Sequence, residues 1–417
     1  MNFKTNVKTG LVNILLITCL MFMSAYPCIA ASIDSEFAGS STCRDCHSDL
    51  YYGWKSTMHP YKFLDASPET IKGDFTDNNT IGEGETQTRM SREGDSFYIS
   101  TVGPDGERRL YPVLYLIGQF WRQHYVTEFK NGALHILPAM WNMKTKKWSD
   151  YKGIASQTPG SGKFWGDSNL TYQDKCTGCH NTESSINYDA TTDTYDTEWA
   201  EKGVSCEACH GPGKAHSLAS KNEKIDTIIN PSRIPDPDLA VMVCGRCHIR
   251  GTSPDSKYAY PMGYEIGDHL DFLFVEGPKL HENDTSAANR QQYIDWKKSG
   301  HAREGVKCWD CHTVHEQGKA NRAMTKLPGS SLCLSCHEVN NIGVHGIHSV
   351  NNCVGCHMPA TGKRAVQGDV HSHQFKVLYP SVNADTGEAE MNSCSLCHYH
   401  EVDSVLELKE ALQNSKN

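Results

Sequence analysis

The stretch Cys206-Glu207-Ala208-Cys209-His210 holds the pattern that organises the chain: two cysteines three positions apart, with a histidine directly after the second. The same C-x-x-C-H pentapeptide begins seven more times, at Cys43, Cys176, Cys244, Cys308, Cys333, Cys353 and Cys394. The chain has 417 residues and 18 cysteines, and all of these cysteines except Cys19 and Cys28 belong to a motif. Spacing this regular predicts a single kind of site repeated eight times.

The spacing within each motif fits covalent attachment of haem. Two thiols three residues apart lie on one side of a helical turn, so each can bond to one vinyl group of a haem. The histidine that follows then ligates the iron. The sequence therefore predicts eight haem c groups. The expected attachment cysteines are Cys43, Cys46, Cys176, Cys179, Cys206, Cys209, Cys244, Cys247, Cys308, Cys311, Cys333, Cys336, Cys353, Cys356, Cys394 and Cys397. The expected iron ligands are His47, His180, His210, His248, His312, His337, His357 and His398.

Two other uses of paired cysteines explain the pattern less well. Zinc ribbons bind metal through two C-x-x-C pairs, but they do not require a histidine after every second cysteine. Disulfide or redox pairs have no use for that histidine either.

Thirteen of the 21 histidines lie outside the motifs, so each of eight irons can take a second histidine. His216 and His315 follow His210 and His312 so closely in sequence that we expect each to ligate a neighbouring haem. His59 and His301 each lie five residues after a tryptophan in two similar segments. The predicted distal ligands are His59, His216, His301, His315, His348 and His373, with His345 and His371 as alternatives to the last two. Methionine would be the other common distal ligand and would raise the reduction potential.

The motif positions divide the chain unevenly. A 133-residue interval separates the first two motifs. It contains the strand-like runs 96–101 and 110–117 around a Gly103–Gly106 turn, then 121–129 and 134–140 around Asn131-Gly132. The sequence predicts a signal peptide over 1–31, a first haem module over 32–89, and a β-rich haem-free insert over 90–150. A seven-haem region over 151–400 and a C-terminal helix over 401–417 follow. The expected fold is a multihaem cytochrome c, mainly short α-helices and loops wrapped around a haem stack.

The N-terminus and the charge bear on location and partners. Lys4 and Lys8 precede an apolar run over 11–23 and a small-residue cleavage site, which is typical of an export signal. Removing it changes the net charge from -9 to -11, which argues against nucleic-acid binding. We expect a periplasmic or extracellular protein with no membrane span after signal removal. Redox proteins or an extracellular acceptor are its expected partners, and a homo-oligomer or filament fits as well.

Several passages resemble multihaem cytochromes c of anaerobic bacteria. These passages are 204–216, 299–308, Cys356-His357-Met358-Pro359, and the segments 121–123, 125–127 and 137–141. The family so resembled is grouped with the tetrahaem cytochrome of ammonia oxidisers, and more distantly with octahaem hydroxylamine oxidoreductase and pentahaem nitrite reductase. The resemblance implies His216, His301, His315 and His373 as distal ligands. The C-x-x-C-K motif of the nitrite reductases is missing from this chain.

Two functions follow from this reading. The favoured one is electron transfer in anaerobic respiration or extracellular electron transfer, with every iron held by two protein ligands. The alternative is an oxidoreductase acting on a small nitrogen or sulfur oxyanion at one five-coordinate haem. Arg122, His124 and Tyr125 are the candidate substrate-binding group, although on a regular strand Arg122 and His124 share a face while Tyr125 points away.

Overall fold

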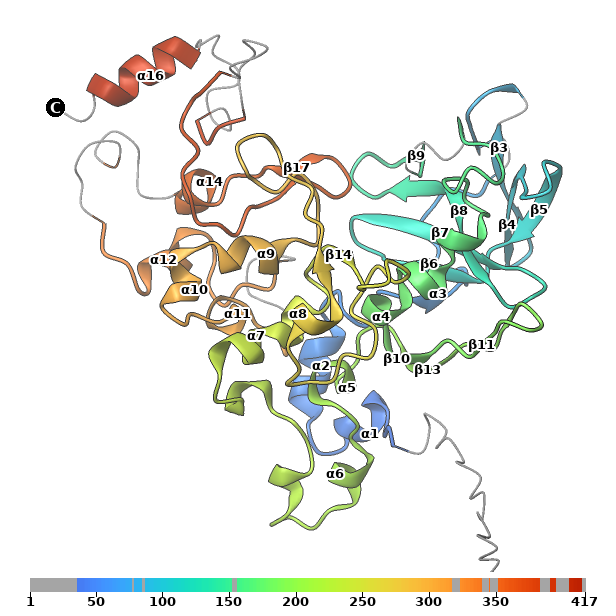
Figure 1. The fold of residues 1–417 in the computed structure, drawn as a ribbon, viewed down its shortest axis with the longest axis horizontal. Coiled ribbons are helices and arrows are strands. Elements are labelled where there is room, and N and C mark those ends of the chain that lie inside the picture. Colours follow the sequence, from blue (N-terminus) through green and yellow to red (C-terminus); the bar gives the residue numbers. More distant parts are fainter. Residues whose placement is uncertain are drawn as a thin grey trace, which may run out of the picture.

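A computed structural model of the chain has two large sheets on one side and short helices with loops on the other (Figure 1). It describes residues 36–76, 79–84, 87–151, 156–316, 323–339, 345, 352–382, 391–394 and 405–414. The predicted signal peptide lies outside these residues, as do His348, Cys397 and His398.

The two large sheets are antiparallel and enclose an apolar core. The five-stranded sheet has the order β1 (Leu64–Asp65), β6 (Tyr115–Ile117), β7 (Arg122–Glu128), β8 (Leu134–Asn142) and β9 (Lys147–Asp150). The four-stranded sheet has the order β2 (Asn79–Ile81), β3 (Thr88–Glu93), β4 (Ser96–Val102) and β5 (Arg108–Pro112). Met90 and Ile99 from the smaller sheet and Leu116, Tyr125 and Leu137 from the larger one are completely buried between them.

Both hairpins expected in this region are present, formed by β4 with β5 and by β7 with β8. Gly106 and Gly132 in their turns have φ angles of 80° and 79°, a conformation that glycine adopts without strain. The sheets begin before the predicted boundary at residue 90. The early strands β1 and β2 are only two and three residues long, so they carry no readable alternation of apolar and polar residues.

The rest of the described chain is built mainly from short helices. They are α1 (Ser40–Arg44), α2 (Ser48–Lys55), α3 (Tyr172–Lys175), α4 (Thr177–His180), α5 (Glu207–His210), α6 (Lys214–Leu218), α7 (Pro237–Gly245), α8 (Leu270–Leu273), α9 (Gln292–Lys297), α10 (Gly300–Arg303), α11 (Cys308–Cys311), α12 (Ser330–Leu334), α14 (Cys353–His357) and α16 (Val405–Asn414). The last of these is the predicted C-terminal helix. Among the described helices, none combines the length and the apolar character needed to cross a membrane.

The seven-haem region contains more β-structure than expected. Four two-stranded sheets lie in it: β10 (Asn181–Ser185) with β13 (Glu198–Lys202), β11 (Tyr188–Asp189) with β12 (Thr194–Tyr195), β14 (Gly251–Thr252) with β15 (Val275–Glu276), and β16 (Gly362–Lys363) with β17 (Gln367–Val370). The expectation of mainly short helices and loops in this region is corrected here to a mixed fold with several small sheets. Strands this short join loops locally and leave little trace in the sequence.

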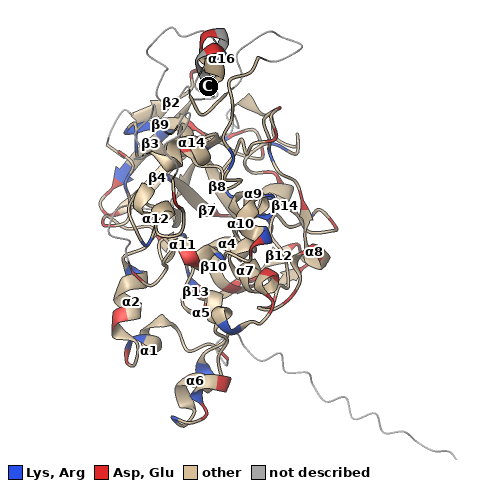
Figure 2. Cartoon of the chain, turned by 90° about the vertical axis from the view of Figure 1, so that its left-hand side faces the viewer, with Lys and Arg blue, Asp and Glu red and all other residues tan. Residues whose placement is uncertain are grey.

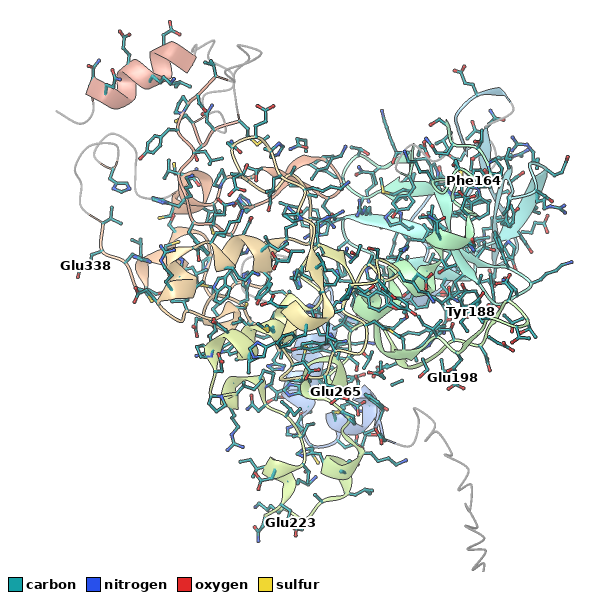
Figure 3. All side chains as sticks on the ribbon, viewed as in Figure 1. Phe164, Tyr188, Glu198, Glu223, Glu265 and Glu338 are labelled. Atoms are coloured by element: carbon teal, nitrogen blue, oxygen red, sulfur yellow. The ribbon has the colours of Figure 1, made fainter. Side chains whose placement is uncertain are left out.

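Lys and Arg positions are interspersed with Asp and Glu positions along the described chain (Figure 2). Glu198, Glu223 and Glu338, for example, lie at its outer edge (Figure 3). The exterior therefore has a mixed charge pattern.

The segment around Trp54 is tied to the residues just before the third motif. The Trp54 indole Nε1–H donates to the carbonyl oxygen of Val204 at 2.9 Å. The Val204 N–H donates to the carbonyl oxygen of His59 at 3.1 Å. Gly203 has a φ of 83° and lies so close to the carbonyl of Pro60 that a side chain would collide with it. Two segments far apart in sequence are thereby joined at the start of Cys206–His210.

The similar segment around Trp296 makes the same contacts before the fifth motif. The Trp296 Nε1–H donates to the Val306 carbonyl at 3.0 Å, and the Val306 N–H donates to the His301 carbonyl at 2.9 Å. Gly305 again precedes the valine, with a φ of 69°. The sequence repeat is therefore a structural repeat. In the first copy, the range 60–203 lies between the two halves.

Candidate haem sites

A connected cavity of about 3030 Å³ is lined by cysteines and the histidine of each of the first six motifs. A pocket for one drug-sized ligand is usually about 300–1,000 Å³, so this space is large enough for several bulky cofactors. The described cysteines form no disulfide, which leaves their thiols available for attachment. The described residues also contain no cluster of three or more metal-binding side chains. An iron held in a porphyrin does not need such a cluster, because it takes at most two ligands from the protein.

Five motif histidines each face a histidine from outside the motifs. The pairs, with the distances between ring centres, are His47–His216 at 6.3 Å, His210–His315 at 6.1 Å, His312–His373 at 6.2 Å, His357–His345 at 6.2 Å and His337–His301 at 5.8 Å. The ring planes lie within 30° of each other in the first four pairs and at 84° in the fifth.

This separation suits an iron between the two rings. A metal–imidazole bond is about 2 Å long, and the ring centre lies roughly 1 Å behind the bonding nitrogen, so two such rings across one metal are about 6 Å apart. Direct ring stacking would bring the centres closer than this. The paired histidines therefore fit the cofactor that the motifs predict.

The outer ring nitrogens of several of these histidines are fixed by backbone carbonyls. The Nδ1 atoms of His210, His216 and His312 each lie 2.8 Å from a carbonyl oxygen, of Ile229, Lys224 and Ala323 respectively. The Nδ1 atom of His373 lies 3.1 Å from the carbonyl oxygen of His371. A carbonyl accepts from Nδ1–H, which leaves Nε2 unprotonated and able to bind a metal.

Burial favours the neutral form of these rings. It lowers the pKa of His373 to about 4, with the charge of His312 adding to the effect. Burial likewise lowers the pKa values of His301, His312, His315 and His357. Neutral imidazole is the form that ligates iron.

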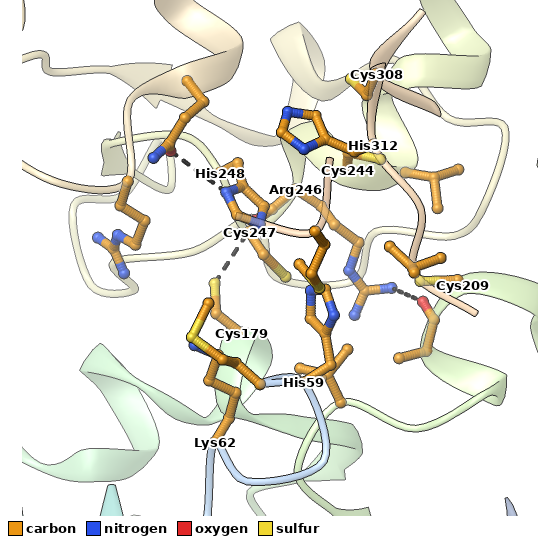
Figure 4. Close-up of a pocket in the computed structure, with 18 of the residues that line it drawn as sticks. His59, Lys62, Cys179, Cys209, Cys244, Arg246, Cys247, His248, Cys308 and His312 are labelled. Carbon is orange, nitrogen blue, oxygen red and sulfur yellow. Dashed lines mark hydrogen bonds between the residues drawn. The ribbon is translucent and has the colours of Figure 1, made fainter. Parts of the chain in front are cut away.

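His59 approaches the fourth motif. Figure 4 shows His59, His248 and Lys62 among the residues that line this part of the cavity. Burial lowers the pKa of His59 to about 3, and the charges of Lys62 and His248 add to the shift. His248 in turn has its Nδ1 3.3 Å from the side-chain oxygen of Gln292. The structure thus brings the predicted distal ligand His59 close to a motif histidine.

His180 of the second motif is different. Within the described residues, no ring pair joins it to another histidine, and its buried Nδ1 has no hydrogen-bond partner. Burial is the main cause that lowers the pKa of His180 to about 3, and the positive charges of Lys62, Arg290 and Arg122 lower it further. The charged neighbours of this ring are therefore cations, and the Lys62 backbone acts on the pKa in the opposite direction.

The other histidines on the sheets have separate roles. His135 is buried, stacks on Phe129 at 4.3 Å, and has its Nδ1 3.1 Å from the carbonyl oxygen of Trp165, so it packs within the sheet region. His124 lines the cavity and contacts the ring of Tyr151 at 4.3 Å.

The candidate group on β7 is arranged largely as strand alternation predicts. Arg122 and His124 line the cavity, whereas Tyr125 is buried in the sheet core. β7 has an irregularity between His124 and Val126, but it does not turn Tyr125 toward the cavity. Tyr151, which sequence reasoning did not single out, contacts His124 in its place.

Thiols of different motifs lie within hydrogen-bonding reach of each other, which shows which motifs are neighbours. The four pairs are Cys43 with Cys206, Cys179 with Cys247, Cys244 with Cys308, and Cys333 with Cys353.

Two further pairs, Cys209 with Cys247 and Cys311 with Cys336, are close enough for their charges to interact. Ser393, next to the last motif, donates its hydroxyl to the Cys356 carbonyl at 2.8 Å. The motifs therefore follow one another in the order first, third, fourth, fifth, sixth, seventh and eighth, with the second beside the fourth.

Comparison with known proteins finds two family matches. Residues 139–211 match the family described as "Cytochrome c554 and c-prime", and residues 300–341 match the doubled CXXCH motif family. The dissimilatory sulfite reductase MccA of Wolinella succinogenes is 26% identical over 180 residues, which are 38% of this chain and 22% of that protein. Cytochrome c-552 of Aliarcobacter butzleri is 20% identical over 184 residues, which are 34% of this chain and 36% of that protein. The matched parts thus span well under half of either relative's length.

The fold resembles that of a solved cytochrome. The outer cell wall cytochrome OcwA superposes with a TM-score of 0.63 and 21% identity, covering 91% of this chain and 86% of that one. The octahaem sulfite reductase MccA of Wolinella succinogenes aligns with a TM-score of 0.41 and 13% identity, covering 86% of this chain and 63% of that one. The repeated motifs, the two family matches and the shared fold place this chain among the multihaem cytochromes c.

Proposed function

We propose that the protein is an exported octahaem cytochrome c that carries electrons between redox partners in anaerobic respiration or toward an extracellular acceptor. The observation that supports this most directly is the set of five histidine pairs about 6 Å apart, each joining a motif histidine to one from outside the motifs. Two histidine ligands fill both axial positions of an iron and favour a low reduction potential. Such an iron exchanges electrons and has no open site for a substrate.

The distal ligands in this proposal are His59, His216, His301, His315, His345 and His373; His348, also predicted from the sequence, lies outside the described residues. Nearly all belong to a different part of the chain from the motif they serve. The order of neighbouring motifs supports a continuous electron path from the first motif through the third to the eighth, with the second as a side branch.

The N-terminal signal predicted over 1–31 supports export, and the likeness to OcwA, an outer cell wall cytochrome, supports an extracellular acceptor. Redox proteins are the other proposed partners, and assembly into a homo-oligomer or filament belongs to the same proposal. The proposal also includes the narrower relationship to the tetrahaem cytochrome of ammonia oxidisers.

A second function, oxyanion chemistry at one five-coordinate haem, is favoured by one observation. His180 lies near the charges of Lys62, Arg122 and Arg290, and no histidine ring is paired with it among the described residues. The sulfite reductase among the relatives matches only part of this chain, so it supports this function weakly.

The proposal is tested on the purified, oxidised holoprotein. Its mass should equal the polypeptide without residues 1–31 plus eight haems, and digestion should place a haem on each of the eight motifs. Electron paramagnetic resonance with spin integration should assign most of the iron to low-spin signals. Fewer haems than motifs, or a spectrum dominated by high-spin iron, would contradict it.

A further inference from the structure

The residue directly before each of the two tryptophans lies against a histidine from outside the motifs. In the first copy of the repeat this residue is Gly53, and a Cβ added to it would overlap the carbonyl oxygen of His315. In the second copy it is Asp295, whose carboxylate Oδ2 accepts the backbone N–H of His373 at 3.0 Å. The structural repeat therefore extends to two of the predicted distal ligands.

These two histidines face motif histidines in closely similar ways. The ring of His315 lies 6.1 Å from that of His210 at an angle of 23°. The ring of His373 lies 6.2 Å from that of His312 at an angle of 24°. The third and fifth motifs each follow the glycine–valine pair that ends a tryptophan segment. The two sites are therefore copies of one arrangement, and the first copy lacks the side chain of Asp295.

Asp295 on α9 is a buried carboxylate without a paired cation. Only 1% of the residue is exposed. Its Oδ1 accepts from the Ser286 hydroxyl at 2.7 Å and from the Gln374 amide at 3.5 Å. Its Oδ2 accepts from the Ser372 hydroxyl at 3.0 Å and from the N–H of His373. All four donors are neutral, and none of the ion pairs among the described residues includes Asp295.

A negative charge next to an axial ligand acts on both the iron and the ligand. Oxidised haem iron carries one more positive charge than reduced iron, so a nearby buried carboxylate favours the oxidised state and lowers the reduction potential. Hydrogen bonding and burial around a haem are two ways in which a protein sets that potential. The bond from the His373 backbone to Asp295 also fixes where this ligand stands relative to His312.

We propose that Asp295 is a positioning residue that holds His373 at the haem of the fifth motif, and that its charge lowers the reduction potential of that haem. The haem of the third motif receives no such charge from the equivalent position, which is Gly53. The inference rests on the proposed electron-transfer function and deepens it, because the fifth motif lies in the middle of the proposed path. An electron on that path passes a site of lowered potential there.

The test is made on the full holoprotein with the two haems marked one at a time. His373→Ala removes one axial ligand and should give the fifth-motif iron a high-spin signal, while it keeps the backbone N–H that Asp295 accepts. His315→Ala marks the iron of the third motif in the same way. Potentiometric titration of each high-spin signal by electron paramagnetic resonance then measures one haem among eight. The marked fifth haem should titrate at a lower potential than the marked third.

Asp295→Asn is then added to each marked protein. Asparagine has the shape of aspartate and keeps an oxygen for the N–H at position 373, but it removes the charge. The midpoint of the fifth-motif signal should rise by about 59 mV, which is a tenfold change in the ratio of oxidised to reduced iron at a fixed potential. The midpoint of the third-motif signal should not change. A purely structural role would not move the potential of one haem in this way.

Two further variants separate the charge from its hydrogen bonds. Asp284 also contacts Gln374, whose amide donates to its carbonyl at 2.7 Å, but its carboxylate is 61% exposed and paired with Lys298. Asp284→Asn should leave the fifth-motif midpoint unchanged, because solvent and salt screen an exposed charge. Ser372→Ala removes one hydrogen bond from Asp295 and keeps the charge, so it should shift the midpoint clearly less than Asp295→Asn does.

The outcomes distinguish this inference from the proposed function. A His373→Ala protein without a high-spin signal would show that His373 is not a ligand, which overturns the inference and that ligand assignment together. A signal whose midpoint ignores Asp295→Asn, or moves equally with Asp284→Asn, overturns the inference alone and leaves the electron-transfer proposal standing. If Asp295→Asn fails to take up eight haems, the order of the two marked midpoints decides, and a fifth haem at or above the third contradicts the charge effect.

Discussion

Without covalent haem attachment, the part of the chain from about residue 156 to 394 is expected not to fold. The cavity lined by the first six motifs measures about 3030 Å³. Without haems, the apolar atoms that line this space would face water instead of porphyrin, so the region would lose much of the burial that stabilises it. Whole domains are stable by only about 5–15 kcal/mol, so this loss is expected to prevent folding.

The two large sheets should behave differently, because they have an apolar core of their own in which Met90, Ile99, Leu116, Tyr125 and Leu137 are fully buried. Trypsin digestion of the haem-free chain should leave a fragment that includes roughly residues 87–151 and remove the rest quickly. The haem-loaded chain, digested in parallel, should resist trypsin over its whole length. A haem-free chain protected over its full length would show that the motifs do not depend on their cofactors.

Replacing His315 is expected to change the spin state and potential of a single haem. His315 faces His210 with ring centres 6.1 Å apart. His315→Ala should convert the iron of the third motif from low-spin to high-spin, because it removes one of two strong ligands. His315→Met should keep it low-spin but raise its potential by on the order of 0.1 V, well within the ~0.8 V range that axial ligands span.

Potentiometric titration with optical and resonance detection measures both effects. His269→Ala is the matched control, because His269 is exposed and contacts Phe272 instead of a motif histidine. The control spectrum should be unchanged. An unaltered low-spin count in His315→Ala would mean that another residue ligates the iron of His210.

Much of this arrangement could be predicted from the sequence, because chemistry fixes local spacing. The C-x-x-C-H pattern predicts where each haem is attached. The number of histidines outside the motifs indicates how many irons can take a second histidine ligand. His216 and His315 follow a motif so closely that a neighbouring haem was the natural expectation, and the structure sets them opposite His47 and His210. The hairpins β4–β5 and β7–β8 carry clear turn signals, and β4 alternates along its length.

Other features depend on contacts between distant segments and leave no local signal. Lys62 is a single lysine in an unremarkable loop, and nothing near it in sequence indicates that it lies beside His180. Tyr151 reaches His124 only because β9 brings the chain back along β8. The two- and three-residue strands are equally hard to predict, since their pairing comes from tertiary packing.

The two tryptophan segments differ in how the chain connects their halves. Trp296, His301 and Val306 form a unit that is nearly continuous in sequence, whereas the same contacts of Trp54 are split by the range 60–203. That range carries both large sheets, the second motif, Lys62 and Arg122. Because the contacts of Val204 with Trp54 and His59 tie the two ends of this range together, the segment before Cys206 is held in place independently of what the range contains.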